Sequence, residues 1–130
     1  MNIESKKVTV NQSAASLFHF LKDVKNFEQL MPESISKFEV IREDAFVFAL
    51  SGMPEIALEV KKEHPHSQLI LGAISDKIPF TLTGNIVSLS EKTSEIQLQF
   101  SGEFNAMMAM MIKGPITKFL GTLTDNLATL

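Results

Sequence analysis

The last quarter of the chain, from about residue 105 to residue 130, carries apolar residues at intervals of three and four positions. These residues are Ile112, Ile116, Phe119, Leu123, Leu127 and Leu130. The spacing places them on one face of a helix. Asn105 is a suitable N-cap for this helix. Because a long amphipathic helix needs an apolar surface to cover, we expect it to pack on the apolar face of a sheet.

Gly114 and Pro115 interrupt the helical pattern about ten residues after Asn105. A proline inside a helix clashes with the carbonyl group four residues earlier and costs about 3 kcal/mol. In the first turn of a helix, however, proline is tolerated. We therefore expect a kink or a break at Gly114–Pro115, with the regular helix over about residues 115–129.

The middle of the chain, from about residue 34 to residue 103, has the two-residue period of strands. Six such stretches are separated by short polar turns, and the alternation is clear in Phe46, Phe48 and Leu50, in Ile56, Leu58 and Val60, in Phe80, Leu82 and Ile86, and in Ile96, Leu98 and Phe100. Short connections predict an antiparallel meander. Gly72, Gly84 and Gly102 lie inside these stretches, where glycine often marks a bulge or a bend. We expect the sheet to curl around the terminal helix.

The N-terminal third predicts one strand followed by two short helices. Residues 3–10 resemble a strand, and Asn11 and Ser13 are both good N-caps for a first helix. The apolar side of that helix is Ala14, Leu17, Phe18, Leu21 and Val24. A second short helix, at about residues 25–31, ends before Pro32. The whole chain thus predicts an α+β fold of the order β-α-α-β6-α.

The composition fits one soluble domain, which we expect to span residues 1–130. Apolar residues make up 45% of the chain and charged residues 21%, which is ordinary for a globular protein. The net charge of -3 argues against a nucleic-acid partner, because such a partner needs a basic surface. We also expect no stable insertion into a membrane, since no apolar run approaches the roughly 20 residues that span a bilayer.

The chain contains no cysteine, which excludes disulfides, thiolate metal ligands and cysteine nucleophiles. The first residues lack the apolar core of a secretory signal. We therefore expect a cytoplasmic protein.

Three stretches resemble the opening of the START/Bet v 1-like (SRPBCC) superfamily. They are Val8-Thr9-Val10-Asn11, Leu17-Phe18-His19-Phe20-Leu21-Lys22-Asp23 and Phe27-Glu28-Gln29-Leu30-Met31-Pro32. The chain is most similar in pattern to the bacterial polyketide cyclase/dehydrase and lipid-transport branch. The resemblance implies a helix-grip fold, in which the terminal helix closes a cavity for apolar ligands against a concave sheet. The chain departs from some family members because it has neither tryptophan nor tyrosine.

No motif in the sequence identifies a reaction. The three histidines are His19, in the first predicted helix, and His64 and His66, which flank a proline in a turn. Two histidines alone do not make a metal site, which needs further ligands. Glu103 falls on the outer face of the last strand by alternation, where water would solvate it. We predict no catalytic residue, no metal and no cofactor.

We hypothesise that the chain binds a small apolar or amphipathic ligand, lipid-like or polyketide-like, in a cavity between the sheet and the terminal helix. The predicted lining is Phe48, Leu58, Leu71, Phe80, Leu82, Phe100, Met108, Met111, Ile112 and Phe119. We expect the side chains to face each other across a gap that they do not fill themselves. Methionine is flexible and lines adaptable binding surfaces, so the cluster Met107, Met108, Met110 and Met111 is a candidate lid.

Two other functions remain open at this stage. One is an enzyme of the cyclase or dehydratase type in the same cavity, which we rank lower because the inward positions offer almost no group for acid–base catalysis. The other is a protein-interaction module with a filled core. In that case the methionines would be core filler or a contact to a partner, including a homodimer contact.

Overall fold

The computed structural model of the chain describes residues 1–51, 55–74 and 79–130. In these residues, eight strands form one antiparallel sheet in the order β1-β8-β7-β6-β5-β4-β3, and β2 also pairs with β8. The strands are β1 (Asn2–Glu4), β2 (Val8–Val10), β3 (Ile35–Arg42), β4 (Ala45–Leu50), β5 (Ile56–His64), β6 (Gln68–Ala73), β7 (Phe80–Ser88) and β8 (Ser94–Gly102). The meander of six strands predicted between residues 34 and 103 is confirmed.

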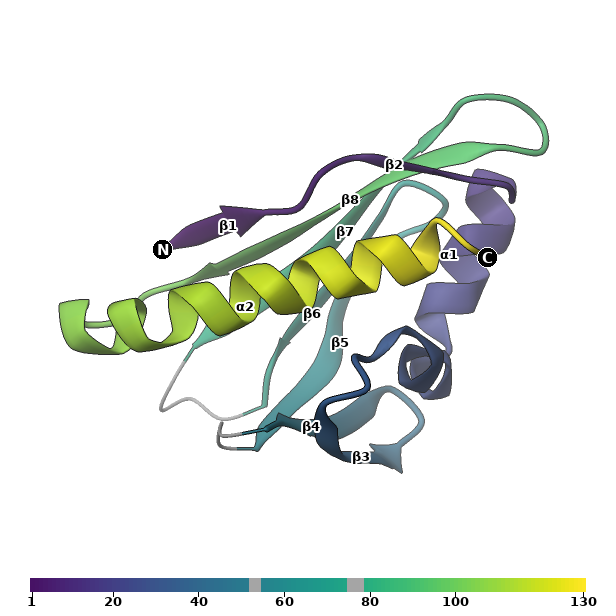
Figure 1. Cartoon of the computed structure of the whole chain (residues 1–130). Coiled ribbons are helices and arrows are strands. Elements are labelled where there is room, and N and C mark those ends of the chain that lie inside the picture. Colours follow the sequence, from purple (N-terminus) through teal and green to yellow (C-terminus); the bar gives the residue numbers. More distant parts are fainter. Residues whose placement is uncertain (52–54, 75–78) are drawn as a thin grey trace.

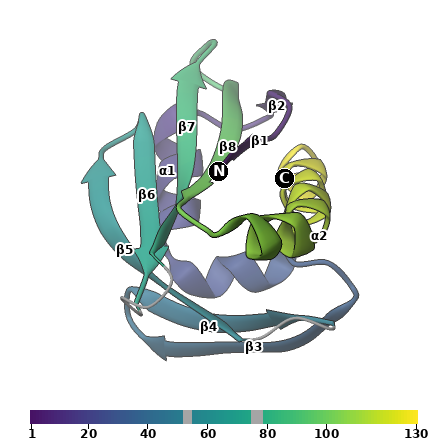
Figure 2. The ribbon, with the colours of Figure 1, turned by 90° about the vertical axis from the view of Figure 1, so that its left-hand side faces the viewer.

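The helices are α1 (Ala14–Lys22), the 3₁₀ helix η1 (Val24–Leu30) and α2 (Ala106–Leu127). Figure 1 shows α2 lying across the sheet. Figure 2 shows the sheet curving around α2, with β3 and β4 on one side and β5 to β8 on the other. In the part of the chain that the structure describes, no helix has the length and hydropathy to cross a membrane.

The first predicted strand is wrong in one respect, because residues 3–10 form two strands instead of one. Glu4 pairs with Gln99 and Val8 with Ile96, so three residues on one side oppose two on the other. The break is stabilised by Ser5, whose Oγ accepts a hydrogen bond of 2.9 Å from the Leu98 N–H. An extra residue of this kind bends a strand and increases its twist.

The two N-terminal helices agree with the sequence pattern. Ser13 is the N-cap of α1, and its Oγ accepts a hydrogen bond of 3.1 Å from the Ser16 N–H. The predicted apolar side of α1 is buried, and Val24 is buried at the start of η1. The 3₁₀ helix ends at Leu30, two residues before Pro32, which cannot continue it.

The terminal helix α2 is longer than the sequence predicts. It begins after Asn105, whose Oδ1 accepts a hydrogen bond of 2.8 Å from the Met108 N–H, and it continues unbroken through Pro115. The expected break is therefore wrong. Proline leaves the Met111 carbonyl without its helical donor, but both residues are exposed, so water can bind that carbonyl. In Figure 2 the green first turns of α2 lie at an angle to the yellow last turns.

The bulges of the sheet lie in β3 and β5, whereas we expected them at the interior glycines. Pairing shifts between Val60 and Lys62 in β5, and twice in β3. The ladders that β7 forms with β6 and β8 run without a shift. Gly102 instead permits the close packing of two phenylalanines, because a Cβ at this position would lie 2.7 Å from Phe104 Cε2 and 2.8 Å from Phe80 Cβ.

Candidate functional site

The concave face of the sheet is built from the alternate residues that the sequence pattern assigned to it. Leu71, Leu82 and Phe100 lie opposite one another across β6, β7 and β8. From the other side, Phe48 on β4 stacks on Phe119 of α2, with ring centroids 5.0 Å apart and planes 11° apart. The apolar side chains of the concave face therefore continue without interruption into those of α2.

The two halves of α2 differ in how deeply they are buried. Every buried residue of the helix comes after Pro115, and they are Ile116, Phe119, Leu120, Leu123, Thr124 and Leu127. Between Ala106 and Pro115 each residue is exposed or half-buried. The second half of α2 is thus packed into the core, while the first half lies on the surface of the core.

The space under the second half of α2 is almost full. A cavity lined by leucines such as Leu71, Leu82 and Leu123 has a volume of about 10 Å³. That is room for about one water molecule, and the apolar lining gives a water no hydrogen-bond partner. Leu21 of α1 and Phe27 of η1 fill this end. The expectation of a gap that the side chains leave open is therefore wrong at this end of the site.

The space beside the first half of α2 has a different character. Apolar side chains that are packed against the core but remain partly exposed are Ile56, Phe80, Phe104 and Ile112. Met108, four positions from both Phe104 and Ile112, is half-buried as well. Phe100 connects two of them, because its ring lies 5.2 Å from that of Phe80 and 6.0 Å from that of Phe104. We call these five partly buried residues the outer apolar set.

The predicted lining residues fall into three groups by burial. Phe48, Leu58, Leu71, Leu82, Phe100 and Phe119 are buried, and Phe80, Met108 and Ile112 are half-buried. The structure does not bring Met111 into this set, because its side chain is 69% exposed. Their role in binding a ligand stays a prediction.

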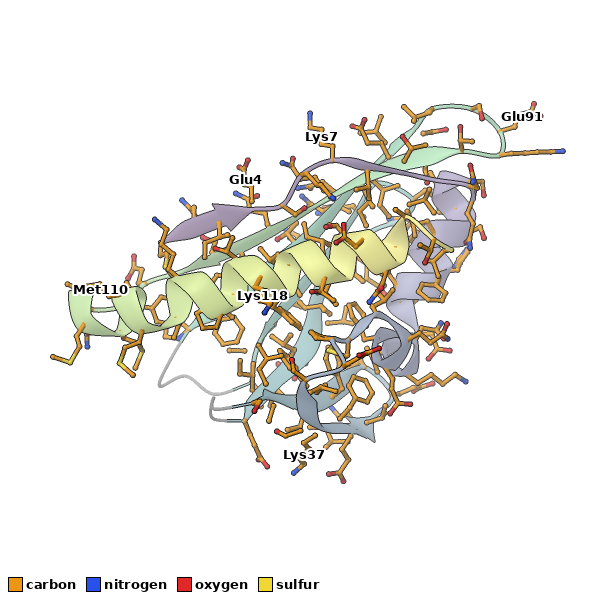
Figure 3. All side chains as sticks on the ribbon, viewed as in Figure 1. Glu4, Lys7, Lys37, Glu91, Met110 and Lys118 are labelled. Atoms are coloured by element: carbon orange, nitrogen blue, oxygen red, sulfur yellow. The ribbon has the colours of Figure 1, made fainter. Side chains whose placement is uncertain are left out.

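Three of the four methionines at the start of α2 face away from the sheet. Met107 is 74% exposed and Met110 is 83% exposed, and both lie on the same side of the helix as Met111. Figure 3 shows Met110 at the end of α2, directed away from the molecule. Met108 is half-buried, so it is the one member of the cluster whose exposure is compatible with the position expected of a lining methionine.

Sequence reasoning missed Phe104, Ile56 and the contribution of α1 and η1. Phe104 lies between the last strand and the N-cap of α2, where no period applies. A signal was nevertheless present, because Phe104, Met108 and Ile112 are spaced by four and continue the buried stripe of α2 backward. The packing of α1 under the sheet could not be found in this way, since it depends on tertiary contacts.

No titratable side chain of the described residues is buried. His19 and His66 are exposed, and their rings are 5.7 Å apart beside Phe18. The described residues contain no group of three histidines or carboxylates that could hold a metal ion. Glu103 is exposed as well.

The polar side chains that are buried in the described part of the chain are Ser94 and Thr124. Ser94 Oγ donates a hydrogen bond of 2.9 Å to the Gln12 carbonyl oxygen, and Thr124 Oγ1 donates one of 2.9 Å to the Gly121 carbonyl oxygen. Both hydroxyls are thus used in holding the chain together, and neither titrates near neutral pH. The described inner face therefore offers apolar burial rather than proton transfer.

Comparison with solved structures identifies this architecture. A START superfamily protein from Mycobacterium smegmatis superposes with a TM-score of 0.71 at 16% sequence identity, covering 98% of this chain and 94% of that one. The chain has the START/Bet v 1-like fold. Norcoclaurine synthase from Thalictrum flavum shares it, with a TM-score of 0.75, 14% identity and coverage of 99% and 84%. No protein-family model matches the chain, and no curated protein matches its sequence.

The START/Bet v 1-like fold confirms the helix-grip architecture that the sequence predicts, with a curved antiparallel sheet around a long terminal helix. Norcoclaurine synthase has been solved in complex with dopamine and hydroxybenzaldehyde, in a structure that superposes here with a TM-score of 0.72 at 12% identity and covers 99% of this chain and 84% of that one. At such identities the likeness extends to the fold and not to individual residues.

Proposed function

We propose that this protein binds a small apolar or amphipathic molecule, lipid-like or polyketide-like, between the first half of α2 and the concave face of the sheet. The observation that carries the proposal is the outer apolar set. Three of its residues, Phe104, Met108 and Ile112, lie in or next to the first half of α2, and all five still expose part of their surface. A ligand that covered this surface would remove these partly exposed apolar side chains from water.

Apolar burial supplies the driving force for this binding. Each Å² of apolar surface removed from water contributes about 25 cal/mol, so a ligand that removes roughly 200 Å² gains about 5 kcal/mol before ordering costs. Aromatic rings add specificity, because Phe80 and Phe104 of the outer apolar set form a chain of rings with the buried Phe100, against which a flat or branched apolar group can pack.

The first half of α2 also provides a way in. None of its side chains is buried. Pro115 has no N–H to donate to the Met111 carbonyl, so a helical hydrogen bond is missing between the two halves. Segments with few buried contacts open at low cost in free energy. Residues 106–115 can therefore move away from the sheet while residues 116–127 stay in the core, which admits a ligand without unfolding the protein.

We propose binding without catalysis. Acid–base catalysis requires a titratable group within hydrogen-bond reach of the substrate. The outer apolar set contains five apolar side chains and no such group. A ligand held there would be shielded from water and bound by contact alone.

The proposal is tested with the uncharged fluorescent probe N-phenyl-1-naphthylamine and three variants. Phe80→Lys and Ile112→Lys place a charge in the outer apolar set, and Met110→Lys places the same charge on the opposite side of α2. We expect the first two to weaken binding of the probe by at least roughly tenfold, since burying an unpaired charge costs several kcal/mol. Met110→Lys should bind like the wild type.

Native mass spectrometry of freshly purified protein complements the titration. We expect an added mass that disappears on denaturation and corresponds to a co-purifying apolar molecule. Unchanged probe binding in both inner variants, with their folds intact by circular dichroism, would contradict the proposal. Equal loss in Met110→Lys would also contradict it, because it would place the probe on the outer side of the helix.

A further inference from the structure

Strand β3 ends the sheet and has no neighbour on its outer side among the described residues. It pairs with β4 alone, and Figure 2 shows it as the outermost strand on that side of the molecule. Val40 is 42% exposed and Ile41 is 44% exposed. An edge strand presents unpaired backbone N–H and C=O groups, which can pair with another strand. The charges along β3 indicate which strand would pair with this edge.

We propose that β3 pairs with β3 of a second copy of this chain, antiparallel and about a two-fold axis at Phe38. In this register Lys37 lies opposite Glu39 of the second copy, and Glu39 lies opposite its Lys37. Residues directly opposite in an antiparallel pair project from the same face and contact each other. The strand is therefore complementary to itself, as an isologous interface requires.

Neighbouring registers are excluded by the same charges. A two-fold axis at Lys37 would place the two copies of Lys37 opposite each other, and an axis at Glu39 would do the same for the two carboxylates. Like charges directly opposite destabilise a strand pair. A shift by one residue would turn every side chain of one copy to the other face. Of the registers centred on the regular part of β3, the one at Phe38 alone brings opposite charges together.

The uncharged neighbours fit this register too. Beyond the charged pairs, Ile35 and Ser36 of one copy would lie near Ile41 and Val40 of the second, which would partly cover the two apolar side chains that β3 exposes. Pairing with β4 shifts between Ile35 and Lys37 and again between Val40 and Arg42. Regular backbone pairing about Phe38 is thereby limited to Lys37–Glu39. Such a short contact makes a dimer that dissociates on dilution.

Lys37 remains available for the second copy although it is paired within its own chain. Its Nζ lies 2.8 Å from Glu55 Oε1 and 3.8 Å from Glu39 Oε2, and its side chain is 40% exposed. An ammonium group has three donors, so a further carboxylate can join without loss of the existing bond. Glu39, whose side chain is 61% exposed, has the same freedom.

Charge exchange tests the pairing directly, by sedimentation velocity over a wide range of protein concentration. We expect the wild type to dimerise, and Lys37→Glu or Glu39→Lys alone to weaken the dimer by roughly tenfold or more, because each turns two attractive pairs into repulsive ones. The two single variants should dimerise when mixed with each other. The double variant, Lys37→Glu with Glu39→Lys, should dimerise by itself.

Lys118→Glu is the matched control, because it makes the same charge change at an exposed position of α2, away from the edge of the sheet. It should leave the dimer unchanged. A wild type that stays monomeric at every concentration would overturn the proposal and would show that the bulges of β3 protect its edge. A dimer that tolerates both single variants would overturn it as well, because the copies would then meet elsewhere.

Discussion

Asn126 joins the end of α2 to the end of η1, because its Nδ2 donates a hydrogen bond of 2.8 Å to the Leu30 carbonyl oxygen. The two residues are 96 positions apart in the chain. This bond, together with the buried leucines around it, fixes the last turns of the helix. The first turns have no equivalent tie among the described residues, and this asymmetry places the proposed ligand site at the first half of α2.

The hydrogen bond of Asn126 should be measurable as stability. Asn126→Ala removes the donor and leaves the Leu30 carbonyl without it, so we expect a loss of about 1–2 kcal/mol in the free energy of unfolding. Urea denaturation followed by circular dichroism measures this loss. Asn2→Ala, at an exposed position of β1, is the matched control and should change stability by less than about 0.5 kcal/mol. Equal effects would show that the bond contributes nothing specific.

The two halves of α2 should respond differently to truncation. Leu123 is 0% exposed and lines the filled end of the site, so Leu123→Ala should cost about 3 kcal/mol, from lost burial and from the space left behind. Met110→Ala, at the exposed end, should cost less than about 0.5 kcal/mol. Thermal and urea unfolding compare the two variants. Similar losses would contradict the division of the helix into a fixed and a free half.

Gly102 should be intolerant of a methyl group. A Cβ at this position would meet the Phe104 ring and the Cβ of Phe80, and the latter belongs to a neighbouring strand and cannot swing away. We expect Gly102→Ala to destabilise the fold by about 1–3 kcal/mol. It should also weaken probe binding, because it displaces two members of the outer apolar set. A variant as stable as the wild type would show that these rings are not packed as described.

Lys37 should titrate above its ordinary range. A hydrogen bond from its side chain to Glu55, and then the charge of that carboxylate, raise the pKa of Lys37 above 10.5. A pKa that is higher in the folded state stabilises the fold below about pH 10.5, and this contribution is lost as the pH rises through the folded pKa. Because the pair is exposed, the effect on stability is small.

A direct measurement of this titration is the chemical shift of the Lys37 side chain, followed by NMR from neutral to strongly alkaline pH. Glu55→Ala should return the midpoint toward 10.5, because it removes both the hydrogen-bond acceptor and the charge. An unchanged midpoint in Glu55→Ala would show that Glu55 does not cause the shift.

Sequence reasoning predicted the parts of this fold that depend on a regular period. The alternation of Phe80, Leu82 and Ile86 located β7 and its inner face, and Ser13, one of two candidate N-caps, is the N-cap of α1. Each of these signals is local. The family resemblance added the way in which the elements assemble, and the comparison with solved structures confirms the fold.

Elements that depend on three-dimensional packing could not be predicted in this way. Pro115 was expected to end a helix, but whether it does so depends on the exposure of the Met111 carbonyl, which the sequence does not show. Met111 was placed in the lining because methionine is apolar, yet the direction of its side chain depends on the rotation of α2 relative to the sheet. The filled end of the site likewise depends on how closely α1 and η1 approach.

The methionines offer the most direct measurement of where a ligand binds. With the seven methionine methyl groups labelled with carbon-13, the protein is titrated with N-phenyl-1-naphthylamine and followed by NMR. If the ligand lies between the first half of α2 and the sheet, the Met108 signal shifts and saturates while the Met110 signal stays in place. Saturable shifts at Met107, Met110 and Met111 with Met108 unchanged, or no binding at all, would contradict the account.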